Sequence, residues 1–144
     1  MKKYIAILLS RCVQLYCLCH ASVTFGVEPF VIPSDHFRQS LLNHIQYYED
    51  KTNALELSDI MHNPTIVYNE VKNDTLQEGY TDSTYWVRFQ VTREKASNSE
   101  IFIEFTYPRL SLIDFYYPDK DNRYQVLHSG NYVPYDDKPI PLRY

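Results

Sequence analysis

The chain has 144 residues, which is the size of a single domain. Hydrophobic residues make up 44% of the sequence and aromatic residues 15%, with fourteen Tyr, so the chain can bury a core and favours β structure over disorder. The formal net charge is −4 and the sequence has no basic cluster, which argues against nucleic acid and anionic membrane surfaces as partners.

The N-terminal residues have the pattern of an export signal. The start is basic, the residues up to Cys19 are mostly apolar, and a sequence close to the small-x-small cleavage pattern ends at Ala21. We therefore expect residues 1–21 to be a signal peptide and residues 22–144 to form one exported domain. Arg11 interrupts the apolar run, so a cytosolic amphipathic start is the alternative interpretation.

The same segment bears on what can hold the domain together. It contains all three cysteines, Cys12, Cys17 and Cys19, so the domain left after cleavage would have no disulfide and would depend on its core. A permanent membrane anchor is not expected, because the apolar run contains Arg11 and falls short of the roughly 20 apolar residues that cross a bilayer.

The first half of the exported domain predicts short elements separated by turns. Residues 27–40 (VEPFVIPSDHFRQS) are an extended lead-in with at most one short strand, and 41–53 (LLNHIQYYEDKTN) is a strand closed by turn residues. Residues 55–64 (LELSDIMHNP) predict one short helix that ends at Asn63-Pro64. A weaker strand follows at 65–71 (TIVYNEV).

The second half has a stronger β pattern. Three aromatic or β-branched runs follow one another at 85–91 (YWVRFQV), 101–105 (IFIEF) and 110–117 (LSLIDFYY). A turn at 118–122 leads to a further short strand in 124–130 (YQVLHSG) and then to a proline-rich exit. Short strands at this spacing predict an all-β fold, a jelly roll or β-sandwich.

Alternation along the strands predicts two different faces. Val87 and Phe89 belong to an ordinary apolar core face, because successive side chains of a strand point to opposite sides. If the three strong strands share one sheet, the opposite face carries Trp86, Arg88, Gln90, Glu104, Asp114 and Tyr116.

This polar face permits two interpretations. A sugar could stack on an aromatic ring while the carboxylates and Arg88 bind its hydroxyls, or an acidic ligand could pair with Arg88 in bidentate fashion. Alternatively, Arg88 pairs with Glu104 or Asp114 across strands and Trp86 covers the pair. Cross-strand charge pairs are common in sheets, which favours the second interpretation.

No other motif predicts chemistry. Asp119 and Asp121 lie in a turn that lacks the glycine and the distal glutamate of a calcium loop, and the histidines have no zinc spacing. A glycosylation sequon at Asn73-Asp74-Thr75 is a short match that arises often by chance. The sequence has no Gly-rich phosphate loop and no nucleophile elbow. We therefore expect no catalytic residue, no cofactor and no metal ion.

The order of the segments resembles a known family. From about His44 to the last residue, the series HIQYYED, LELSDI, GYTDSTYWVRFQV, IFIEFTYPRLSLIDFYYPD and YQVLHSGNYVPYDDKPIPLRY resembles the second extracellular domain type of seven-transmembrane receptors with diverse intracellular signalling modules (7TMR-DISM). The resemblance implies a periplasmic sensor with a jelly-roll fold similar to carbohydrate-binding modules. It also maps the family's Trp-x-Arg, Glu and Asp-x-Tyr onto Trp86, Arg88, Glu104, Asp114 and Tyr116.

The resemblance leaves several possible roles. In the family the domain continues with further strands, then seven inner-membrane helices and an output unit, whereas this sequence ends at Tyr144. We therefore expect the last strands to be missing and the chain to be the ligand-sensing fragment of a receptor. Its partners would be a small-molecule or carbohydrate ligand and a membrane-embedded receptor part. The alternatives are a stand-alone secreted carbohydrate-binding module and an interaction fragment that completes its sheet with another chain.

Overall fold

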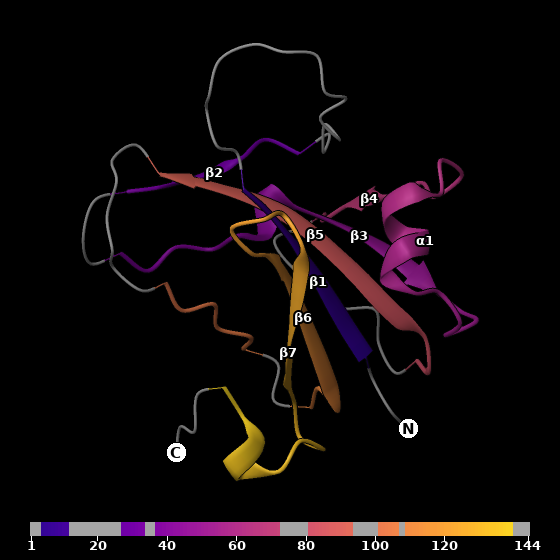
Figure 1. Ribbon diagram of the computed structural model, residues 1–144. Coiled ribbons are helices and arrows are strands. Elements are labelled where there is room, and N and C mark those ends of the chain that lie inside the picture. Colours follow the sequence, from indigo (N-terminus) through magenta and orange to yellow (C-terminus); the bar gives the residue numbers. More distant parts are fainter. Residues whose placement is uncertain are drawn as a thin grey trace.

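The computed structural model is mostly β-strand with one short α-helix, and it describes residues 4–11 (backbone), 27–33, 37–72, 81–93, 101–106 and 109–139. The all-β prediction is confirmed. The strands are β1 (Tyr4–Arg11), β2 (Phe30–Ile32), β3 (Ile45–Asp50), β4 (Asn69–Glu70), β5 (Thr84–Arg93), β6 (Leu112–Pro118) and β7 (Tyr124–Ser129). The helix α1 spans Leu57–His62, and two 3-10 turns span Leu42–His44 and Tyr135–Asp137 (Figure 1).

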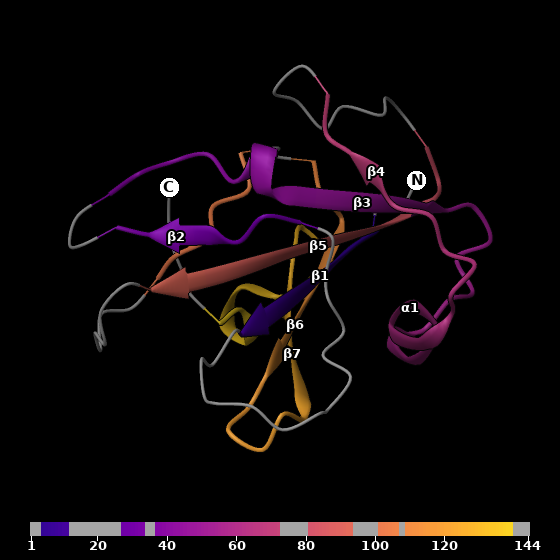
Figure 2. The same cartoon turned by 90° about the horizontal axis from the view of Figure 1, so that it is seen from above.

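The seven strands are hydrogen-bonded into one sheet with the order β4-β3-β5-β1-β6-β7, and β2 pairs with the end of β5 (Figures 1 and 2). β1 runs parallel to both of its neighbours, β5 and β6. β3 pairs antiparallel with β4 and β5, and β7 pairs antiparallel with β6. This arrangement is consistent with an all-β sandwich, while the jelly-roll connectivity stays a prediction.

The apolar N-terminal run forms the central strand β1. Its sequence, YIAILLSR, is rich in aliphatic residues that suit a strand with partners on both edges. The expected signal peptide therefore overlaps a strand of the sheet, and the rest of that segment, residues 12–21, lies outside the described residues. The removal of residues 1–21 as a signal peptide stays a prediction.

One face of β5 forms the main core, as the alternation predicts. Val87 is 5% exposed and Phe89 2%, and they pack with Leu110 and Ile113. Burying each of these side chains contributes about 1.5–3 kcal/mol, so this cluster contributes substantially to the stability of the fold.

One predicted strand is wrong in this structure, and another is shorter than predicted. Residues 101–106 are described without strand pairing, and both edges of β5 are occupied by other strands, β3 and β2 along one and β1 along the other. Ile103 packs against the core from outside the sheet. In the weaker predicted strand only Asn69–Glu70 pairs with β3, because Ile66 and Tyr68 pack instead on the second face of the sheet.

The predicted helix is confirmed at Leu57–His62. Glu56 and Asp59 form a capping box at its start, and it ends at Asn63, directly before Pro64. Ile60 is 6% exposed and directs the helix onto the sheet. Among the described residues, no helix combines the length and the apolar character that a membrane span requires.

A buried carboxylate organises the turn between β3 and α1. Asp50 is 2% exposed, and its side chain accepts hydrogen bonds from the backbone N–H groups of Thr52, Asn53 and Leu55 and from the Thr52 hydroxyl. Burial by itself raises the pKa of Asp50, but these hydrogen bonds together bring it below its ordinary value. Ionised Asp50 therefore stabilises the folded state above the pKa of the unfolded chain, and this contribution is lost as the pH falls through the folded pKa.

We expect Asp50→Asn to lower the free energy of unfolding at neutral pH by about 1–3 kcal/mol. An amide has one acceptor oxygen where the carboxylate has two, so some of these hydrogen bonds are lost. The acid-induced fall in stability below about pH 4 should also become shallower, because this titration is removed. Urea unfolding at pH 7 and at pH 3 measures both effects. Asp82→Asn, at an exposed position, is the control. Equal pH profiles for Asp50→Asn and the unsubstituted chain would contradict the assignment.

Gly130 allows the chain after β7 to cross the start of β6. It has a φ of +109°, and a Cβ there would lie 2.6 Å from the Ser111 carbonyl oxygen and 2.8 Å from Leu112 Cα. This close approach lets the backbone N–H groups of Asn131 and Tyr132 donate to the carbonyls of Leu110 and Ser111, both at 2.9 Å.

We expect Gly130→Ala to destabilise the domain by about 1–3 kcal/mol, because the side chain is strained at this φ and collides with backbone atoms. Thermal unfolding monitored by circular dichroism measures the change. Lys120→Ala, on the exposed turn of the same hairpin, should unfold like the unsubstituted chain. A Gly130→Ala protein that melts with this control would show that the close approach is not formed.

Candidate functional site

The second face of the sheet carries an aromatic cluster. We use this name for Trp86 of β5, Tyr48 of β3, Tyr116 of β6 and Tyr68. Trp86 and Tyr116 stack with ring centroids 6.0 Å apart and an interplanar angle of 21°, and Tyr48 lies opposite Trp86 in the strand register. The arrangement follows from strand alternation, which sends Trp86 away from the core residues that flank it.

Within the cluster Trp86 is buried, whereas its three tyrosines are partly exposed. Trp86 is 5% exposed and packs with Ile60 of α1, and Ile66 packs against this pair from the segment after the helix. β alternation predicts the face on which Trp86 lies but not what covers that face. The buried indole Nε1 of Trp86 has no hydrogen-bond partner within the described part of the chain.

Arg88 lies half-buried beside this cluster. Its Nε and Nη2 donate to Gln46 Oε1 on the neighbouring strand at 3.1 and 2.7 Å, and its Cζ lies 3.5 Å from the centroid of the Tyr68 ring. Burial lowers the pKa of Arg88, and Tyr68 partly opposes that effect. Burial likewise raises the pKa of the Tyr68 phenol. The guanidinium is therefore held by an amide and an aromatic face.

The two predicted carboxylates have partners other than Arg88. Glu104 forms an exposed ion pair with Arg38 at 2.8 Å, and Asp114 Oδ1 lies 2.7 Å from His128 Nδ1. The expected cross-strand pair of Arg88 with Glu104 or Asp114 is therefore not formed. Exposed pairs of this kind contribute about 0–1 kcal/mol, so they fix local geometry more than stability.

The structure thus brings together part of the predicted set. Trp86 and Tyr116 are in contact, and Arg88 joins them through Tyr68. Asp114 lies near enough to Tyr116 to add to the effect of burial, which raises the pKa of that phenol. Glu104 is separate, because residues 101–106 are not a strand of this sheet.

Sequence reasoning did not include the residues that complete the site. Gln46 and Tyr48 alternate on one side of β3, which was a usable signal, but nothing local showed that β3 would pair with β5. Tyr68 and Ile60 could be found only from the way the helix segment folds over the sheet.

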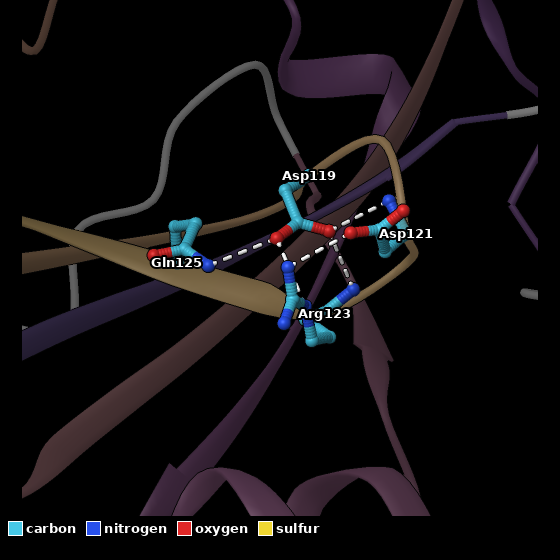
Figure 3. Close-up of polar contacts among 4 residues, drawn as sticks. All are labelled: Asp119, Asp121, Arg123 and Gln125. Atoms are coloured by element: carbon cyan, nitrogen blue, oxygen red, sulfur yellow. Dashed lines mark hydrogen bonds and ion pairs between the residues drawn. The ribbon is translucent and has the colours of Figure 1, made fainter.

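In the acidic turn after β6, the carboxylates of Asp119 and Asp121 are bound by hydrogen-bond donors of the same hairpin (Figure 3). Asp119 accepts from the backbone N–H groups of Asp121 and Arg123 and from the Gln125 side chain, and Arg123 pairs with both carboxylates. The hydrogen bond from the Arg123 backbone is the largest of the effects that lower the pKa of Asp119. Over the described ranges no group of three or more His, Cys, Asp or Glu is placed to hold a metal ion.

A family model described as 7TMR-DISM extracellular 2 matches residues 42–144. The chain belongs to this family. The family assignment made from the segment order is therefore confirmed, and with it a sensor-type domain whose family name implies an exported location. No curated protein and no solved structure matches the chain.

The matched range separates the elements of this 7TMR-DISM domain into two groups. β3 to β7, α1 and every member of the aromatic cluster lie inside residues 42–144. β1 and β2 lie before it. The cluster therefore belongs to the family part of the chain, whereas the central strand of the sheet does not.

A double-mutant cycle tests which partner Arg88 has. We expect Arg88→Ala and Gln46→Ala to be coupled by about 0.5–3 kcal/mol, because each removes the same hydrogen bonds. Arg88→Ala and Glu104→Ala should be additive within about 0.5 kcal/mol, because the two residues share no contact. Urea unfolding of the single and double variants gives both coupling energies. Coupling to Glu104 instead of Gln46 would contradict the geometry.

Proposed function

We propose that this domain is a non-enzymatic periplasmic ligand sensor, exported by a signal peptide at residues 1–21, whose ligand is a carbohydrate. The sensor-type family supports the sensing role. In this proposal the domain binds its ligand without chemical conversion. A change of shape on binding is then transmitted to a membrane-embedded receptor part.

The observation that carries the proposal is the indole N–H of Trp86. A buried donor without a partner costs about 1–3 kcal/mol, and a ligand hydroxyl that accepts this hydrogen bond would recover that cost. The same cluster offers the C–H faces of a sugar two stacked rings, Trp86 and Tyr116, with the Arg88 guanidinium and the Asp114 carboxylate near its border.

Binding at this place would also change the shape of the domain. Because Ile60 and Ile66 cover Trp86, a ligand reaches the indole only when α1 and the following segment move aside. α1 is six residues long, and Ile60 is its one buried residue, so a small rearrangement is sufficient. Such a coupled movement distinguishes a sensor from a stand-alone carbohydrate-binding module, which needs no change of shape to act.

Trp86 is the one tryptophan of the chain, so intrinsic fluorescence reports directly on the proposed site. We expect titration with a panel of mono- and oligosaccharides to give a saturable fluorescence change and a raised melting temperature for at least one sugar. Tyr116→Ala should weaken that binding about tenfold or more, which corresponds to ~1.4 kcal/mol, because the second stacking ring is lost.

Arg123→Ala, in the exposed turn after β6, is the matched control and should bind like the unsubstituted chain. A folded protein whose fluorescence and melting temperature respond to no sugar would exclude a carbohydrate ligand. The same panel extended to small carboxylic acids tests Arg88 as an anion site. Equal affinity of Tyr116→Ala would exclude the aromatic cluster as the place of binding.

A further inference from the structure

The sheet depends on a strand that comes from outside the family part of the chain. β1 pairs with β5 from Tyr4↔Thr84 to Arg11↔Val91 and with β6 from Tyr4↔Leu112 to Leu8↔Tyr116. β5 and β6 have no backbone pairing with each other, so β1 joins the two halves of the sheet, as Figures 1 and 2 show. The family match begins at residue 42 and therefore includes both neighbours of β1 but not β1.

The same residues have a second predicted role. Tyr4–Arg11 lies within the segment that the sequence predicts to be an export signal. The two roles exclude each other in one molecule, because cleavage after Ala21 would remove the strand. A processed chain would then expose the inner edges of β5 and β6, where N–H and C=O groups have lost their partners.

In a processed chain, side-chain packing would keep the inner edges of β5 and β6 separated by the space that one strand occupies. Adjacent strands are about 4.8 Å apart, so β5 and β6 lie roughly 9–10 Å from each other. Val87 and Phe89 of β5 pack with Leu110 and Ile113 on one face, and Trp86 stacks on Tyr116 on the other. Side chains of β5 and β6 therefore contact each other on both faces of the sheet at the position of β1. These contacts favour binding of a new strand between β5 and β6 over direct pairing of the two strands.

We propose that the position between β5 and β6 is a strand-acceptor site, which binds an extended aliphatic segment of another polypeptide when Tyr4–Arg11 is absent. The chemistry of the occupant follows from β1 itself, which is eight residues long and carries no charge before Arg11. The inference goes beyond the proposed ligand sensing, and it rests on the export signal of the proposed function, because the site opens only when residues 1–21 are removed. Addition of a strand supplies affinity through backbone hydrogen bonds.

Two other occupants fit less well. Residues 101–105 of the same chain have a strand pattern, but Ile103 already packs on the core and Glu104 is bonded to Arg38. A second processed copy of the chain would itself lack Tyr4–Arg11 and could not donate it. We therefore assign the site to a segment of a different protein, and β1 itself shows the chemistry that this segment requires, an apolar strand without charge before its last residue.

The full chain can be used for the test. A protease site inserted between Ala21 and Ser22 allows the folded protein to be cut, and a labelled peptide of the sequence Lys2–Arg11 is then added in excess. We expect the peptide to replace the N-terminal fragment at one copy per domain, with the amides of β5 and β6 protected from hydrogen exchange. The matched peptide with Ile7→Pro should bind at least tenfold more weakly, because proline lacks the N–H and is not tolerated in a central strand.

Each result decides the matter. Uptake of the labelled peptide, or refolding of the cut chain when it is added, would support the site. A cut chain that releases its fragment, takes up no peptide and keeps β5 and β6 protected would overturn it, and so would a cut chain that stays unfolded with the peptide or forms a dimer that excludes it. In the uncut chain, unprotected amides at residues 4–11 would also overturn the proposal.

Discussion

The burial of β5 on both of its faces is the constraint on which the rest of the structure depends. Val87 and Phe89 enter the core on one side, and Trp86 is equally buried on the other. A strand of this kind needs a partner on each edge and a cover on each face. β3, β1 and β2 provide the edges, while α1 and the residues after it provide the second cover.

This constraint also determines the character of the candidate site. A polar side chain on a covered face must find partners there, and Arg88 does so with Gln46 and the ring of Tyr68. Carboxylates farther from β5 pair locally with Arg38 and His128. The result is an aromatic cluster with one guanidinium rather than a network of charges.

Ligand sensing and strand addition would use different parts of the same sheet. Trp86 of the aromatic cluster lies beneath α1 and the residues after it, whereas the proposed strand-acceptor site would lie in the plane of the sheet between β5 and β6. The two parts meet at Trp86 and Tyr116, which stack across the position of β1. In the two proposals, occupancy of one site would change the packing that supports the other, so a bound ligand and a partner chain would influence each other through these two rings.

Local patterns were sufficient for most elements. Aromatic and β-branched runs and residue alternation predicted β3, β5, β6 and β7, and the segment 55–64 with its end at Asn63-Pro64 predicted α1. The same patterns failed at 101–105, whose IFIEF sequence is as strand-like as any other. A strand needs a free edge as well as a propensity, and edges are assigned by competition among distant segments.

The sequence by itself therefore determined the all-β class, the two faces of β5 and the family, because each depends on residue order within a short segment or along the matched range. Only the tertiary structure decided that Trp86 is covered, that Gln46 rather than Glu104 holds Arg88, and that Tyr4–Arg11 occupies the centre of the sheet. The reason is that pairing and covering join residues far apart in the chain, and their free energies depend on which competing partner is present.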